Sequence, residues 1–282
     1  MSEVALYNGL TQDQLFAAMG VQQDSANEQG SNRLPILKIN YQEEDDKGNE
    51  LKKGAFALTL PSGTVYGKDV RVRVFSDYMQ YLDYDPAQEA VVNKTIIHRG
   101  GDEPIDEKGG IRCGKPTSNA LREMGDDIRE KYKSITCFRY LYAKVSISDA
   151  ATADGTAVEV KDEPCLFRMK GASFLAFNSV TESCRAQKLK FLEVESAVTT
   201  ERQKKGSVTY FTTKFEPDFS NIIPITSDDL HFMSKILDTV NFENKQVMAK
   251  YNEALRNSQE DVRDEKLVGE VEEYLDDFDE TA

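Results

Sequence analysis

Three aromatic side chains and a lysine alternate along the stretch "CFRYLYAKVSIS". Side chains of a β-strand point alternately to its two faces, so one face would be small and apolar. The other face would carry the row Phe138, Tyr140, Tyr142 and Lys144. Rings at this spacing can stack on unpaired bases, and a cation beside them can contact phosphate. The row predicts a platform for single-stranded nucleic acid, and the alternative is that the rings pack beneath a second layer.

Basic residues on other predicted strands would line a phosphate path beside these rings. The stretch "DVRVRVF" alternates strictly, with valines on one face and two arginines on the other. "FRMKG" and the predicted hairpin tip "ERQKKG" add further cations. The expected nucleic-acid contacts outside the first row are Arg71, Arg73, Phe75, Arg168, Lys170, Lys204 and Lys205.

Patterns typical of enzymes are weak in this chain. "GGIRCGKPT" approaches a phosphate-binding loop, but Pro116 stands where a Ser or Thr would hold magnesium. Asp83 and Asp85 could bind a catalytic metal only with a third ligand that the sequence does not indicate. Only two histidines are present. We therefore expect no catalytic residue, no metal and no cofactor, and an enzyme of nucleic-acid metabolism is the least favoured class.

The C-terminal stretch "GEVEEYLDDFDETA" combines acidic residues with apolar ones. Its carboxylates could compete with phosphates for a basic groove, while Tyr274, Leu275 and Phe278 could enter an apolar pocket on a partner protein. A solvated terminus kept for solubility is the alternative. The pattern predicts a tail that recruits other proteins when DNA displaces it.

Charge and composition are consistent with a neutral body between two acidic ends. Residues 1–32 carry four acids and no Lys or Arg, residues 33–226 carry 29 of each sign, and residues 227–282 carry 16 acids and six bases, which gives −4, 0 and −10 and the total of −14. No apolar run approaches the roughly 18 residues of a membrane span, and no signal peptide is evident. Four cysteines without a close pair favour reduced thiols. We expect a cytoplasmic protein with no membrane partner.

The elements that must position these residues are mostly strands. Short strands with turn signals and one or two inserted helices predict a β-rich α+β fold, an OB-like Greek-key barrel or a sandwich. A helical period follows, with apolar residues at intervals of three and four. The predicted divisions are a short helix and flexible leader at 1–32, the β-rich core at 33–226, a C-terminal helix at 227–257, and an acidic disordered tail at 258–282.

A strand-rich body, the face in "CFRYLYAK" and an acidic end with aromatics together resemble the single-stranded DNA-binding proteins of tailed bacteriophages. The resemblance is one of architecture, and it departs from the family where "DETA" follows Phe278. It implies an OB-fold body, no enzymatic activity, and tail contacts with replication or recombination proteins.

Two functions fit these patterns. The first is binding of single-stranded DNA without sequence preference in phage replication or recombination, with self-association as a homo-oligomer. The alternative is a phage structural or host-interaction protein whose β-domain binds protein. Retardation of a labelled single strand separates the two.

Overall fold

The computed structural model describes the backbone of residues 34–279, and the side chains of these residues apart from Ser118, Lys131 and 259–279. The predicted leader at 1–32 lies outside the described residues. The strands are β1 (Ile36–Ile39), β2 (Phe56–Leu60), β3 (Gly63–Gly67), β4 (Val70–Asp85), β5 (Ala90–Lys94), β6 (Ile135–Ile147), β7 (Ala151–Thr152), β8 (Val160–Lys170), β9 (Glu195–Lys205) and β10 (Val208–Asp218). The α-helices are α3 (Ser118–Glu123), α4 (Asp126–Lys131), α5 (Asn178–Ala186) and α6 (Ser227–Asp279).

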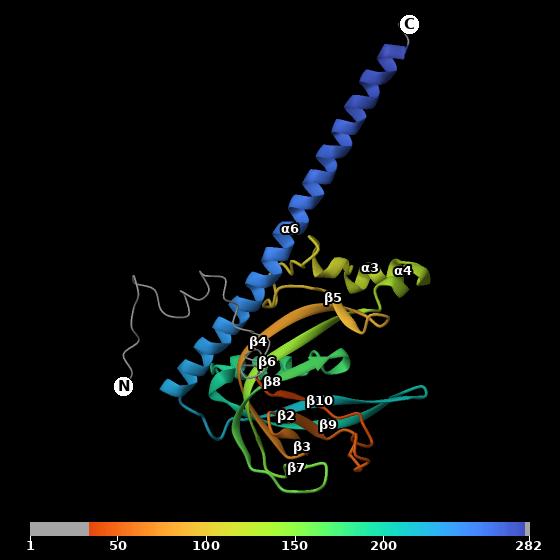
Figure 1. The fold of residues 1–282 in the computed structure, drawn as a ribbon. Helices are drawn as coiled ribbons and strands as arrows, with labels where there is room; N and C mark the ends of the chain where they lie inside the picture. The colour runs from red at the N-terminus through yellow and green to blue at the C-terminus, as the bar shows by residue number, and fades with distance from the viewer. Residues whose placement is uncertain (1–33, 280–282) are drawn as a thin grey trace, which may run out of the picture.

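All of these strands join one mixed, open sheet, so the β-rich class predicted from the sequence is confirmed. The order across the sheet is β10-β9-β4-β6-β8-β1-β2-β3-β7, and β5 pairs with the far end of β4. Neighbouring strands are antiparallel except β1 and β8, which are parallel. Figure 1 shows the strands gathered in one body from which α6 projects.

The sheet curls until the β9–β10 hairpin touches the connection between β1 and β2. The Tyr41 hydroxyl donates a hydrogen bond to the carbonyl oxygen of Phe211, and the two rings meet edge to face at 6.0 Å. The Thr200 hydroxyl donates to the carbonyl oxygen of Gly54. Gly54 has a φ of +79°, and a Cβ there would lie 2.4 Å from the Phe211 ring. Only glycine therefore suits this contact.

The concave side of the curled sheet holds the larger core. Alternation along β4 and β6 sends Val70, Val72, Leu141 and Val145 inward, where they are fully buried with residues from β2, β8 and β10. Helix α5 closes one end with Val180. The inward and outward faces predicted for the two strands are thus confirmed.

The opposite side of β4 and β6 carries a second core beneath α6. The pairing of β4 with β6 shifts between Val74 and Ser76, a bulge that leaves Phe75 without a partner and places both Phe75 and Tyr78 on the outer face. Phe232, Ile236 and Val240 of α6 pack on this face with spacings of four residues, which is one helical face. The amphipathic pattern predicted for 227–257 thus has its partner in the outer aromatic row.

Helix α6 begins at a reciprocal cap. The backbone N–H of Asp229 donates to the Thr226 hydroxyl, and the N–H of Thr226 donates to the Asp229 carboxylate. Further along, the Asn244 side chain exchanges two hydrogen bonds with the backbone of Ile97, at 2.7 and 2.8 Å. The helix then runs on to Asp279, past the boundary at 257 and through the stretch for which the sequence predicts a disordered tail. Its C-terminal part extends away from the body (Figure 1).

Candidate nucleic-acid interface

The aromatic row predicted to face water is buried. Phe138, Tyr140 and Tyr142 are 8%, 7% and 4% exposed and belong to the core cluster that includes Phe232, Ile236 and Val240 of α6. The Tyr140 hydroxyl donates to the Gln80 side-chain oxygen at 3.1 Å, and burial raises the pKa of Tyr140 to about 12. The prediction that Tyr140 and Tyr142 stack on bases is therefore wrong for this arrangement of the chain. Their outer face is a packing surface for an amphipathic helix.

Two of the predicted phosphate contacts hold α6 in place instead. Arg73 and Lys144 both pair with Asp229 of the first helical turn, at 3.0 and 2.6 Å, and Asp229 is 1% exposed. Burial acts to raise the pKa of Asp229, but the hydrogen bonds from Lys144 and Thr226 and the charge of Arg73 outweigh it and lower this pKa to about 2. Arg73 and Lys144 thus share one buried carboxylate inside the protein and are not free to bind phosphate.

Phe75 and Arg71 are also corrected. Phe75 is 2% exposed, and the cations of Arg73 and Lys144 lie 4.9 and 5.4 Å from its ring centre. Arg71 is half exposed, but it pairs with Glu195 at 3.3 Å and approaches Asp218 at 3.9 Å. Each of these two residues therefore has an interaction within the protein that occupies it.

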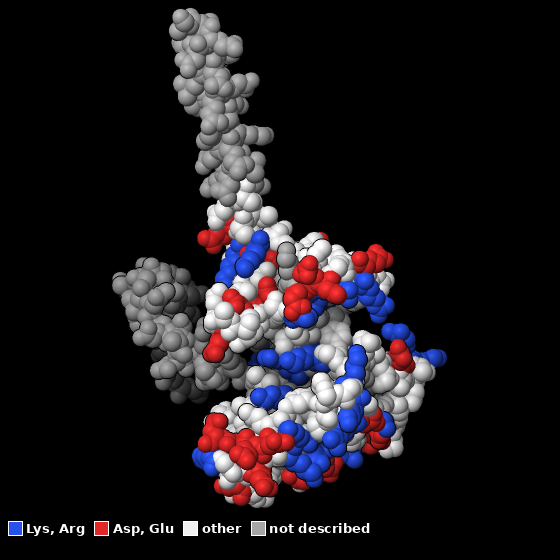
Figure 2. Space-filling model, turned by 90° about the vertical axis from the view of Figure 1, so that its right-hand side faces the viewer, with Lys and Arg blue, Asp and Glu red and all other residues white. Residues whose placement is uncertain are grey.

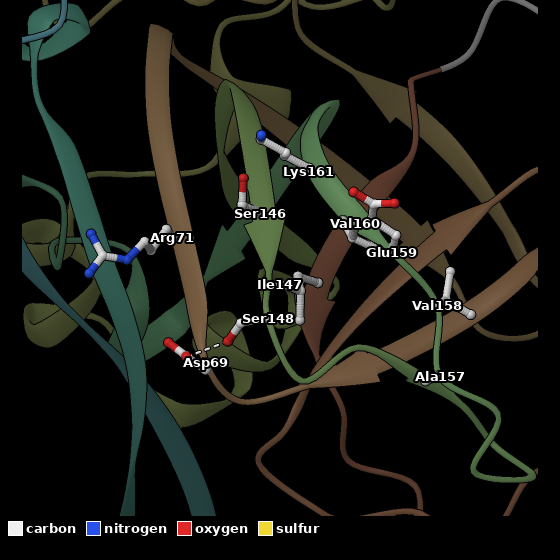
Figure 3. A pocket seen from close by; sticks show the side chains of 10 residues that line it. All are labelled: Asp69, Arg71, Ser146, Ile147, Ser148, Ala157, Val158, Glu159, Val160 and Lys161. Atoms are coloured by element: carbon white, nitrogen blue, oxygen red, sulfur yellow. Dashed lines mark hydrogen bonds between the residues drawn. The ribbon is translucent and has the colours of Figure 1, made fainter.

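Arg71 also lies far from Arg168 and Lys170, two other predicted phosphate contacts, at the opposite end of the strands. It borders a shallow pocket of about 500 Å³ with Ser146, Lys161 and Glu159, at the opposite end of β6 and β8 from Phe138 and Lys170. In Figure 3 its guanidinium points away from the other labelled side chains. Arg71 and Arg168 therefore cannot line one short phosphate path.

Arg168 and Lys170, in contrast, are exposed at the end of β8. Arg168 lies over the Phe138 ring with 4.4 Å between the guanidinium carbon and the ring centre, and Lys170 lies 5.6 Å from the same centre. Leu37 of β1 pairs with Phe167, so Lys38 follows beside Arg168 on the neighbouring strand. The three cations line one hollow of about 620 Å³, and the edge of Phe138 lines it too.

A second hollow continues the first past Tyr41. It measures about 490 Å³ and is lined by Tyr41, Glu43, Lys53, Arg202, Thr209 and Phe211. Tyr41 borders both hollows and is 52% exposed. We call the two hollows together the basic groove, lined by Lys38, Tyr41, Lys53, Arg168, Lys170, Arg202 and Phe211.

Most cations of the basic groove are free to meet a ligand. Lys38, Arg168, Lys170 and Arg202 take part in none of the ion pairs among the described side chains. Lys53 pairs with Glu43 at 2.6 Å. Figure 2 shows the face toward which the β9–β10 hairpin points in Figure 1, where Lys and Arg side chains gather on the lower body beside an acidic patch. The groove can therefore attract a negatively charged ligand that also carries aromatic rings.

Lys204 and Lys205 stand exposed at the tip of the β9–β10 hairpin, two and three residues beyond Arg202. They lie on the same strand as Arg202 but line neither hollow. Of the predicted set, the structure thus brings together Arg168, Lys170 and Phe138, which line the first hollow. The sequence reasoning missed Lys38, Tyr41, Lys53 and Phe211 as site residues. The available signal was in "LPILKINY", where Lys38 follows the apolar Leu37; the structure exposes Lys38 and buries Leu37.

The remaining predicted motifs have local roles. In "GGIRCGKPT", the stretch that resembles a phosphate-binding loop, the Lys115 ammonium donates to the Ile135 carbonyl oxygen at 2.6 Å. Asp85 accepts hydrogen bonds from Ala87 and Gln88 in the turn after β4. Among the described residues, no three His, Cys, Asp or Glu side chains are placed to hold a metal ion. The four cysteines are free thiols, as predicted.

The side chains of Tyr274, Leu275 and Phe278 lie outside the described ones, so their predicted contact with a partner stays a prediction. None of the helices in the described part of the chain combines the length and apolar character needed to cross a bilayer. Comparison of the chain with protein-family models, with curated proteins and with solved structures finds no match in any of the three.

Proposed function

We propose that this protein binds single-stranded DNA without sequence preference along the basic groove. The observation that carries the proposal is the run of unpaired cations, Lys38, Arg168 and Lys170, that leads to the exposed ring of Tyr41. Phosphates of a strand would meet the cations, and the binding would release counterions. An unpaired base would stack on Tyr41 or Phe211, which a base inside a duplex cannot do.

The curled sheet supports the finer assignment to an OB-like body. OB folds bind single strands on an outer face of a partly open barrel, with loops at its rim. Here the groove lies where β1, β8 and the β9–β10 hairpin approach one another, and the tip carries Lys204 and Lys205. The resemblance to phage proteins supports a role in phage replication or recombination.

Reversal of two groove charges tests the proposal. The variant Arg168→Glu with Lys170→Glu should bind labelled oligo-dT at least about tenfold more weakly, and its plot of log affinity against log salt should be shallower by about two. Fluorescence anisotropy at several salt concentrations measures both quantities. Both side chains are exposed, so the stability of the variant should change little.

The matched control is Lys245→Glu with Lys235→Glu, two exposed lysines of α6 outside the groove, which changes the net charge equally. This control should keep most of the affinity. Equal losses in the two variants would assign the effect to overall charge and refute the groove. A wild-type protein that binds no oligonucleotide at low salt would refute DNA binding altogether.

The second proposed element is the acidic segment beyond Asn257, which carries eleven acids and two bases. A chain that ends at Asn257 should bind oligo-dT about three- to tenfold more tightly at low salt, because a competitor for the cations is gone, and the difference should vanish at high salt. A full-length variant with Tyr274, Leu275 and Phe278 changed to alanine keeps the charge and should bind DNA as the wild type does. Equal affinities of the truncated and full chains would exclude competition by the tail.

A protein-binding role is the second candidate, and one observation favours it. Leu230 and Leu237 are 59% and 47% exposed and lie seven residues apart on α6, which places them on one face of the helix away from the sheet. Such a ridge suits a second copy of the chain or another helix. Sedimentation of the wild type and of Leu230→Gln with Leu237→Gln distinguishes self-association from a monomer.

A further inference from the structure

The connection between β1 and β2 is an acidic hairpin beside the basic groove. Residues 42–50, which we call the acidic hairpin, carry Glu43, Glu44, Asp45, Asp46 and Glu50 against the single cation Lys47, a net charge of −4. The DNA-binding function proposed above gives no role to these charges. Their position is unusual because a groove that binds phosphate would gain affinity without them.

The base of the acidic hairpin is held by a buried side chain. Asn40 is 4% exposed, and its amide donates to the carbonyl oxygens of Gln42 and Lys52 at 2.9 and 3.1 Å. The Asn40 oxygen accepts from the N–H of Gln42 at 3.1 Å. Both ends of the hairpin are therefore tied to one residue at the end of β1.

The tip of the acidic hairpin is also ordered by hydrogen bonds. The Asp45 carboxylate accepts from the backbone N–H groups of Lys47 and Asn49 and from the Asn49 side chain, at 2.8–2.9 Å. These bonds, first the one from the Asn49 side chain, lower the pKa of Asp45. The N–H of Leu51 donates to the Glu43 carbonyl oxygen at 2.6 Å. The acidic residues are thus carried on a loop that hydrogen bonds hold in one conformation.

This fixed loop borders both hollows of the groove. Asn40, Tyr41 and Gln42 line the first hollow, and Tyr41 and Glu43 line the second. The contact of Phe211 with Gly54 fastens the same connection to the β9–β10 hairpin. Glu43 lines the second hollow, where it pairs with Lys53 at 2.6 Å, and the other four acids follow it along the same fixed loop.

We infer that the acidic hairpin makes the groove selective for single strands by repelling the second backbone of a duplex. The inference rests on the proposed binding of DNA along the groove. A single strand is flexible and can place its phosphates on Lys38, Arg168 and Lys170 while it turns away from the carboxylates. A duplex is stiff over about 150 base pairs and carries two backbones, so one of them must pass the acidic hairpin. Selectivity then comes from an unfavourable contact with the wrong ligand.

The test removes the repelling charges and keeps the loop. The hairpin variant carries Glu44→Gln, Asp46→Asn and Glu50→Gln, while Glu43, which pairs with Lys53, and Asn40 and Asp45, which order the loop, are unchanged. The control variant carries Glu123→Gln, Asp127→Asn and Glu253→Gln, three exposed acids outside the groove that pair with no described cation. Both variants lose three negative charges relative to the wild type, so a general effect of net charge is the same in each.

The measured quantity is the ratio of duplex affinity to single-strand affinity for a labelled 20-mer at about physiological salt. We expect this ratio to rise about tenfold in the hairpin variant relative to the control variant, mainly through tighter duplex binding. Equal ratios in the two variants, with single-strand binding intact, would overturn the role of the acidic hairpin and leave the proposed function standing. Failure of the wild type to bind the single strand would overturn both.

Discussion

Replacement of Asp229 by alanine should lower the free energy of unfolding by about 3–5 kcal/mol. Asp229 is 1% exposed, and it is the shared partner of Arg73 and Lys144, whose side chains are 10% and 19% exposed. Its removal leaves two cations facing each other in a site that water hardly reaches. The cap on the first turn of α6 is lost in the same change. Urea denaturation followed by circular dichroism measures the difference.

Asp228→Ala is the matched control, because Asp228 is the preceding residue of the same turn and is exposed. It should change the stability by at most about 0.5 kcal/mol. If the two alanine variants unfold at the same urea concentration, Asp229 does not anchor α6 to the sheet, and the buried state of the aromatic row needs another cause.

The same carboxylate predicts how the wild type responds to acid. The pKa of Asp229 is lowered from 3.8 to about 2 in the folded protein, so the stability that this group contributes is complete above about pH 4. It is lost as the pH falls toward 2, and the loss is on the order of 2 kcal/mol. In Asp229→Ala the fall in stability over this window should be smaller by about that amount. An unchanged pH profile would show that other carboxylates set the acid sensitivity.

Local patterns in the sequence were sufficient to predict the two central strands and which of their side chains point into the inner core. Alternation along 70–74 and 138–147 separates side chains that enter the inner core from those that point outward, and the structure follows it residue by residue. The strand predicted at 69–75 runs on to Asp85 as β4, because the pairing with β6 resumes after the bulge at Phe75. A period of two is a local property, so a single strand reveals it.

The sequence could not show what covers the outer face. The sequence predicts an aromatic row on one strand face and, some 90 residues later, an amphipathic helix. Each has an apolar surface that needs a partner. The two are joined by Asp229, a residue that looks like an ordinary acid in a charged stretch. Leu230 and Leu237 follow the same helical period as Ile236 and Val240, yet they stay exposed. Periodicity alone cannot separate the two sides of such a wide stripe.

The groove was still harder to predict from the sequence than the cover of the outer face. It depends on the parallel pairing of β1 with β8, whose paired residues lie 130 positions apart, and on the contact between Tyr41 and Phe211, which are 170 positions apart. No local signal encodes these pairings. Arg168 and Lys170 were found because they alternate with buried neighbours, whereas Tyr41 follows the end of a strand, where a tyrosine has many uses. Residues at an edge formed by distant segments are therefore the ones that sequence patterns miss.

A comparison of two tyrosines distinguishes the predicted stacking face from the groove. Tyr142→Ala should lower the free energy of unfolding by about 3–5 kcal/mol, because it opens a cavity beneath α6, where Tyr142 packs edge to face with Tyr78. The folded variant should bind oligo-dT as the wild type does. Tyr41→Ala should behave in the opposite way, with a small change in stability and a loss of about 1–3 kcal/mol in binding for each base that it stacks.

Denaturation and fluorescence anisotropy on the same two preparations measure both effects, and Tyr142→Leu, which fills more of the cavity, serves if the alanine variant is unfolded. A loss of affinity in folded Tyr142→Leu without one in Tyr41→Ala would mean that α6 moves away from the sheet when DNA binds. The outer aromatic row would then be the binding surface, and Asp229 would occupy in the free protein the place that a phosphate takes in the complex.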